Sequence, residues 1–141
     1  AEDGIRDSDS VSAFLLNRSS DLGTMKTLLG ISAEVQKAKR GLSEEGKNQL
    51  SVKQELQADC FAGIWGNHAS RSRQLLERGD IEEGLQAASA IGDDRLQKQS
   101  RGYVTPESFT HGSSAQRVHW FKVGLEKGSM SACNTFASRS R

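Results

Sequence analysis

The chain has 141 residues, of which 35% are hydrophobic, so it can form one modest domain with its own core but not two. Its 19 Lys and Arg residues nearly balance 18 Asp and Glu residues, whereas a dedicated nucleic-acid surface needs clustered cations well beyond such a balance. No run of about 18 apolar residues occurs, which excludes a membrane-spanning segment within this sequence.

Residues 1–24 are polar and rich in Ser and Asp, apart from one apolar run at 11–16. They end in Gly-Thr directly before Met25, which looks like a cloning junction followed by a start residue. We therefore expect a foreign or disordered leader outside the folded domain. The alternative is a native arm whose apolar run docks as a helical turn.

Helical patterns fill the chain from residue 25 to residue 136. Apolar positions predict a helix over 25–40, a turn-rich connector over 41–47, and a long helix that begins at residue 48 or 49 and continues at least to Trp65. The sequence thus predicts an all-α fold with a single small helical domain over 25–136, followed by a loose tail over 137–141.

The long helix carries two acids on the side that normally faces a core. At about 100° per residue, Glu55 and Asp59 share one arc with Val52 and Leu56. Burying an unpaired carboxylate costs several kcal/mol, so these acids should meet a cation, a metal or strong donors. The more ordinary interpretation is a helix-end or salt-bridge pair, because surface acids are common.

Further helix starts are predicted by capping patterns. Asp80 and Glu83 have capping-box spacing, and Gly92 fits a left-handed helix stop. Asp93 and Asp94 could bind a cation, but the more ordinary expectation is that they stabilise the start of another short helix and pair with an Arg.

A last helix is predicted after Ser113, which has capping-box spacing with Gln116. His111 lies just before it in a loop flanked by Gly, where its ring can reach into a cleft or simply satisfy loop carbonyls. Arg117 is expected to support that loop or to pair with Asp93 or Asp94.

Several segments together resemble the bacterial neutral zinc metallopeptidase family, which is gluzincin-like, over about residues 28–136. The segments that carry the resemblance are Glu55-Leu-Gln-Ala-Asp-Cys-Phe-Ala-Gly-Ile-Trp, Gly79-Asp-Ile-Glu-Glu-Gly-Leu-Gln-Ala-Ala, Ser108-Phe-Thr-His-Gly-Ser-Ser-Ala-Gln-Arg and Cys133-Asn-Thr-Phe. In that family these segments follow a His-Glu-x-x-His helix that supplies two zinc ligands and the general base. The three histidines here, His68, His111 and His119, form no such motif.

The resemblance implies a role for each candidate site residue. Glu55 would be the third metal ligand, and Asp59, one turn later, would hold a zinc-binding His from behind. His111 would donate to the oxyanion as water attacks a peptide carbonyl. The resemblance also favours a Cys60–Cys133 disulfide over two free, buried thiols.

A catalytic zinc site needs three protein ligands, and the pattern offers one. We therefore expect the C-terminal half of a zincin-like metallopeptidase that lacks the His-Glu-x-x-His helix. The parent would bind zinc and hydrolyse peptide or protein substrates, while this chain alone would be inactive and would bind zinc weakly or not at all.

The competing hypothesis is a non-catalytic helical module that binds a partner or a second copy through an exposed apolar face. By resemblance, the parent is expected to be periplasmic or extracytoplasmic and anchored by an upstream membrane helix.

Overall fold

The computed structural model describes residues 22–72 and 78–137, and every regular element within these ranges is helical. The prediction of a small all-α domain is confirmed. The elements are α2 (Leu22–Ala38), α3 (Glu44–Ser72), α4 (Arg78–Ala90), α5 (Asp93–Arg101), the short 3-10 helix η1 (Pro106–Ser108), α6 (Ser114–Lys127) and the 3-10 helix η2 (Met130–Cys133).

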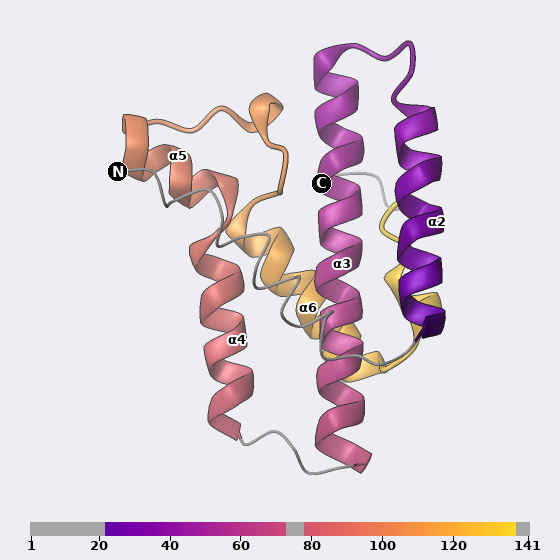
Figure 1. Ribbon diagram of the computed structural model, residues 1–141. Coiled ribbons are helices and arrows are strands. Elements are labelled where there is room, and N and C mark those ends of the chain that lie inside the picture. Colours follow the sequence, from indigo (N-terminus) through magenta and orange to yellow (C-terminus); the bar gives the residue numbers. More distant parts are fainter. Residues whose placement is uncertain (1–21, 73–77, 138–141) are drawn as a thin grey trace.

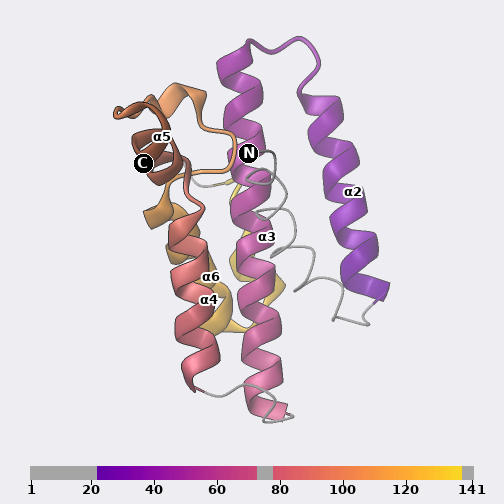
Figure 2. The same ribbon diagram turned by 60° about the vertical axis from the view of Figure 1, so that its left-hand side comes forward.

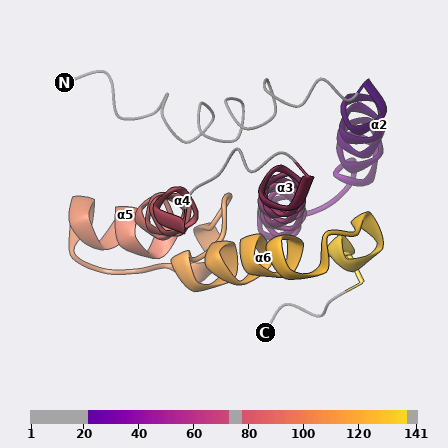
Figure 3. The same ribbon diagram turned by 90° about the horizontal axis from the view of Figure 1, so that it is seen from below.

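The long helix α3 lies at the centre of the arrangement (Figure 1). Helices α2 and α4 flank it on opposite sides and both run antiparallel to it, as the turned view also shows (Figure 2). Helix α6 crosses α3 and α4 on one face, which is clearest from below (Figure 3). The site-bearing residues of α3 therefore face elements that come much later in the chain.

Two glycines allow α3 and α6 to cross in backbone contact. A Cβ added at Gly63 would collide with the backbone of Phe121, and a Cβ added at Gly124 would collide with the carbonyl of Cys60. Because no side chain separates the two helices here, the crossing point is fixed closely. Both glycines are buried.

A disulfide joins Cys60 of α3 to Cys133 of η2, with a Cα–Cα distance of 5.7 Å, and both residues are fully buried. Two side-chain hydrogen bonds add to this attachment. The Gln57 Nε2 donates to the Cys133 carbonyl at 2.9 Å, and the Thr135 hydroxyl donates to the Lys53 carbonyl at 2.6 Å. The C-terminal segment is thereby fastened along α3.

Some predicted helix ends are wrong. The central helix begins at Glu44, earlier than predicted, because the Ser43 hydroxyl accepts the Gly46 amide at 3.2 Å and starts the helix there. Helix α4 begins at Arg78, so Asp80 is already inside its first turn rather than capping it. Gly92 has φ −67° and is the N-cap of α5, not a left-handed stop.

Part of the predicted domain division lies outside the described residues. The predicted leader over 1–24 falls mostly there, although α2 begins at Leu22. The predicted tail over 137–141 is described only at residue 137. Both boundaries stay predictions. Within 22–72 and 78–137, no helix has the length and hydrophobicity that crossing a membrane requires.

Candidate functional site

The two acids of α3 point inward, and the deeper one is held by an arginine. The Arg117 Nε donates to Asp59 Oδ2 at 2.8 Å and its Nη2 donates to Asp59 Oδ1 at 2.9 Å, while Arg117 is only 1% exposed. This bidentate pair links α3 to α6. The predicted pairing of Arg117 with Asp93 or Asp94 is wrong, because the crossing of α3 and α6 brings Asp59 closer.

Glu55 lies one turn before Asp59 and is more accessible. Its Oε2 is 3.9 Å from Arg117 Nη2, and its side chain keeps 31% of its surface exposed. Arg117 is therefore an internal cation for both acids. The remaining guanidinium nitrogen, Nη1, is buried without a hydrogen-bond partner among the described residues.

Burial and charge act in opposite directions on this pair. Burial raises the pKa of Asp59 above its ordinary value, and the guanidinium of Arg117 limits that rise. Burial by itself lowers the pKa of Arg117, but the carboxylates of Asp59, Glu55 and Asp93 bring the net pKa above its ordinary value. Arg117 is thus a permanent positive charge next to the two acids.

The loop that carries His111 is held by the first residue of α5. Asp93 Oδ2 accepts the backbone amides of Thr110 at 2.9 Å, His111 at 2.7 Å and Gly112 at 2.9 Å. The Asp93 amide in turn donates to the Gly112 carbonyl at 2.8 Å. Although burial raises the pKa of Asp93, the hydrogen bonds from His111 and Gly112 leave it below its ordinary value.

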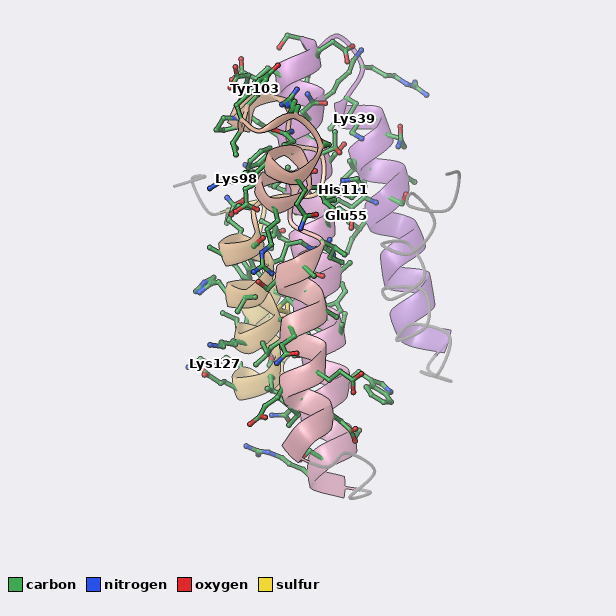
Figure 4. All side chains as sticks on the ribbon, turned by 90° about the vertical axis from the view of Figure 1, so that its left-hand side faces the viewer. Lys39, Glu55, Lys98, Tyr103, His111 and Lys127 are labelled. Atoms are coloured by element: carbon green, nitrogen blue, oxygen red, sulfur yellow. A yellow bond between two sulfur atoms is a disulfide. The ribbon has the colours of Figure 1, made fainter. Side chains whose placement is uncertain are left out.

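The imidazole of His111 contacts the same carboxylate. Its Nδ1 lies 3.4 Å from Asp93 Oδ1 and 2.9 Å from the Thr110 hydroxyl, and 35% of its side chain is exposed. The hydrogen bond with Asp93 raises the pKa of His111, and the negative charge of Glu55 raises it further. Figure 4 shows Glu55 and His111 at the same height of the bundle. The charge of Glu55 is therefore near enough to favour the protonated form of the His111 ring.

Asp94 fixes the next part of the same segment. Its Oδ1 accepts the Ser114 amide at 2.7 Å and the Ser114 hydroxyl at 2.9 Å, at the start of α6. A Cβ at Gly92 would collide with the backbone of Ser114, so only Gly allows this approach. The predicted capping box at Ser113 and Gln116 is present, with Ser113 at the N-cap of α6.

The sequence interpretation missed the role of Asp93 and Asp94. They were expected to stabilise their own helix and to pair with an Arg, but they hold a segment that lies 17 to 20 residues later. A sequence does not show which backbone amides a carboxylate accepts, so the contacts of Asp93 and Asp94 with the later segment could not be predicted from it. The Nε2 of the exposed His68 donates to the Gly128 carbonyl at 3.1 Å, away from these residues.

The described residues fit a metal only in part. Glu55 is a partly exposed carboxylate and a suitable oxygen donor, but both oxygens of Asp59 already accept Arg117. Within 22–72 and 78–137, no group of three or more His, Cys, Asp or Glu side chains gathers closely enough to hold a metal ion. A complete zinc site requires donors beyond those described.

A buried Asp–Arg pair, an accessible Glu and a His whose pKa is raised by a fixed carboxylate together make this part of the helical domain a candidate functional site. The model of the family described as "Putative neutral zinc metallopeptidase" matches residues 10–136, and the chain belongs to this family. The match begins before Met25, inside the predicted leader.

The chain is also similar to curated bacterial proteins. The chain is 54% identical over 112 residues to the protein called "Uncharacterized protein YpfJ" of Escherichia coli strain K12, covering 79% of this chain and 39% of the relative. It is 41% identical over 123 residues to "Uncharacterized protein Rv2575" of Mycobacterium tuberculosis, covering 81% of this chain and 40% of that relative. The chain therefore spans about 40% of the length of the curated relatives it matches. No solved structure matches the chain.

Proposed function

We propose that the whole protein to which this chain corresponds is a zinc-dependent peptidase and that this region supplies part of its active site. The observation that supports the proposal is the placement of Glu55 beside the His111 loop. Glu55 is the accessible acid of the α3 pair, and its charge acts on the His111 imidazole. Family membership supplies the reaction class, since the family is described as neutral zinc metallopeptidases.

Glu55 is proposed to be a metal ligand, with further donors coming from outside the described residues. The zinc, when bound, would supply Lewis acidity and lower the pKa of a bound water toward neutrality. Arg117 holds Asp59 through two hydrogen bonds one turn after Glu55, which fixes the orientation of the Asp59 carboxylate. A carboxylate offers about four lone-pair sites, so Asp59 can accept an imidazole N–H as well as Arg117. Asp59 is therefore proposed to orient a zinc-binding His from behind.

His111 is proposed to donate a hydrogen bond to the oxygen that becomes negative when water adds to a peptide carbonyl. Asp93 fixes its Nδ1 side and favours the protonated ring, so the opposite nitrogen, Nε2, carries a proton to donate. Removing one such donor costs about 100- to 1,000-fold in kcat in enzymes where this has been measured.

The proposal is tested by metal analysis and a peptidase assay on this chain beside a longer form that carries a His-Glu-x-x-His helix. The longer form is expected to contain zinc and to cleave a peptide substrate, whereas this chain is expected to do neither. Equal activity in the two forms would contradict the assignment, because two His ligands and the general base belong to the missing motif.

The Cys60–Cys133 disulfide supports an extracytoplasmic location, since such bonds persist in oxidising compartments. We propose this location for the whole protein, together with an upstream membrane anchor. Fractionation of cells that express the whole protein tests it. Recovery of the protein in the soluble cytosol with free thiols would contradict it.

A second candidate function, partner binding or self-association, is favoured by one specific surface. A groove of about 500 Å³ lies between α2 and α3 and is lined mainly by apolar side chains, including Ile31, Val35, Leu50 and Phe136. An apolar groove of this kind is a common docking place for another chain. Gel filtration with light scattering is expected to show concentration-dependent dimers if this candidate is correct, and a monomer at all concentrations would weigh against it.

A further inference from the structure

Asp93 makes an unusual set of contacts for a residue at the start of a helix. One of its oxygens accepts three consecutive backbone amides, those of Thr110, His111 and Gly112, at 2.7 to 2.9 Å. Its other oxygen faces the ring of His111 at 3.4 Å. A single buried carboxylate therefore fixes both the backbone and the imidazole of His111.

The backbone conformation of the loop matches this arrangement. Gly112 has φ +94°, a value that favours glycine, and this allows its amide to join the two preceding ones around a single oxygen. Successive amides that converge in this way form a concave anion site, which the Asp93 carboxylate fills from within the same chain. A Cβ added at Gly112 would lie 3.3 Å from side-chain atoms of Val52 and Leu56, so the loop lies close to the part of α3 that carries Glu55.

Asp94 provides the natural comparison within the same structure. It has the same charge, is the next residue along the chain, and binds the next segment through Ser114. No described contact joins Asp94 to His111. A role in His111 placement should therefore belong to Asp93 alone, while a general role in loop folding should belong to both.

We propose that Asp93 is the positioning residue of this site: it sets the location and orientation of the His111 side chain relative to Glu55 through three loop amides and the imidazole. The proposal rests on the proposed function only for its catalytic consequence. Its structural content, that Asp93 and not Asp94 controls the His111 ring, stands independently of any peptidase activity.

NMR on this chain tests the structural content first. In the wild-type chain, couplings through hydrogen bonds are expected between the Asp93 carboxylate carbon and the amide nitrogens of Thr110, His111 and Gly112. This measurement needs no variant, so a substitution that fails to fold does not affect it. Absence of all three couplings in the folded protein would overturn the proposal.

The variants Asp93→Asn and Asp94→Asn are then compared by titrating the His111 ring. Asp93→Asn is expected to move the His111 pKa down toward its ordinary value and to speed amide exchange at Thr110, His111 and Gly112. Asp94→Asn is expected to leave the titration unchanged and to affect only Ser114. Equal effects of both variants on the ring would reduce Asp93 to a loop-folding residue.

The catalytic consequence is measured in the longer, zinc-containing form. Asp93→Asn is expected to lower kcat about 10- to 100-fold with little change in KM, and Asp93→Glu to restore part of the loss, because positioning acts on the transition state. An inactive wild type with the NMR results intact would refute the proposed function while leaving the positioning role in place. A kcat unchanged by Asp93→Asn would refute positioning in an active enzyme.

Discussion

At the scale of single residues, the site is organised by one buried guanidinium. Arg117 is 1% exposed and neutralises Asp59 through two short hydrogen bonds while lying near Glu55. Arg117 therefore compensates part of the negative charge of the two acids on α3. The sequence predicted a cation, a metal or strong donors for these acids. The partner of Asp59 in the structure is Arg117, which is 58 residues away and could not be chosen from spacing.

Arg117→Met is expected to destabilise the chain by about 3–5 kcal/mol, because it leaves a buried carboxylate without its partner. The combined change of Arg117→Met with Asp59→Leu is expected to be much less damaging, since it removes both charges. Urea unfolding of the two single variants and the double variant measures this. If the double variant loses the sum of the two single losses, the two side chains do not interact and the account of the pair is wrong.

The pH dependence of stability follows from His111. Its pKa is raised in the folded chain, above an ordinary value of about 6.5, so its contribution is fully present below that pH and is lost as pH rises through the folded-state pKa. In the wild type, the free energy of unfolding should therefore decline as the pH rises from about 6.5 through the folded-state pKa of His111. It should decline less in His111→Gln.

His119→Gln serves as the control, because His119 is exposed and its ring packs against Trp120 rather than Asp93. It should keep the wild-type pH profile. Identical profiles for the wild type and His111→Gln would show that Asp93 and Glu55 do not act on the His111 ring as described.

At the scale of helices, the crossing of α3 and α6 places the site. Gly63 and Gly124 let the two backbones touch, and this contact sets Arg117 of α6 opposite Asp59 of α3. Both glycines can be read in the sequence, but the sequence does not show that the two helices cross at these positions. The capping box of α6 was predictable because its two residues are three apart, whereas the crossing joins residues some 60 apart.

Gly124→Ala is expected to cost about 1–3 kcal/mol or more, because the new methyl group meets backbone that cannot move aside. Gly30→Ala is the matched control: Gly30 lies inside α2 with no atom within 4 Å of an added Cβ. There the better helix propensity of Ala should stabilise the chain by up to about 1 kcal/mol. Thermal or urea unfolding of both variants measures these changes. If Gly124→Ala leaves the free energy of unfolding unchanged, the helices do not cross as closely as described.

Helix ends were the least predictable feature of the elements. Gly92 was expected to stop α4 in a left-handed conformation, but its φ is −67° and its importance is the absence of a side chain beside Ser114. The physical requirement at Gly92 is space for another segment, which no local pattern reports. Likewise, no local pattern shows that Asp93 accepts the amides of Thr110, His111 and Gly112.

At the scale of the whole molecule, the C-terminal segment is tied to the centre of α3 by the Cys60–Cys133 bridge. The two residues are 73 positions apart, so the bond closes a long loop that includes α4, α5 and α6. Cys60 directly follows Asp59, so the bond also steadies the turn of α3 that carries the Arg117 partner.

Removal of this bond by the double change Cys60→Ala and Cys133→Ala is expected to cost about 4 kcal/mol, mainly by relaxing a constraint on the unfolded chain. Wild-type unfolding with and without a reductant gives the same comparison without substitution. A wild-type chain that shows two reactive thiols under native, non-reducing conditions would contradict the bridge.

The claim on which the account depends is that Glu55 helps to hold a catalytic metal in the whole protein. The most direct measurement is the zinc content of a longer form that carries a His-Glu-x-x-His helix, determined by mass spectrometry with and without Glu55→Gln. We expect about one zinc per chain in the wild type and loss of that zinc in Glu55→Gln. The matched surface variant Glu45→Gln should keep its zinc. Undiminished zinc in Glu55→Gln would contradict the account.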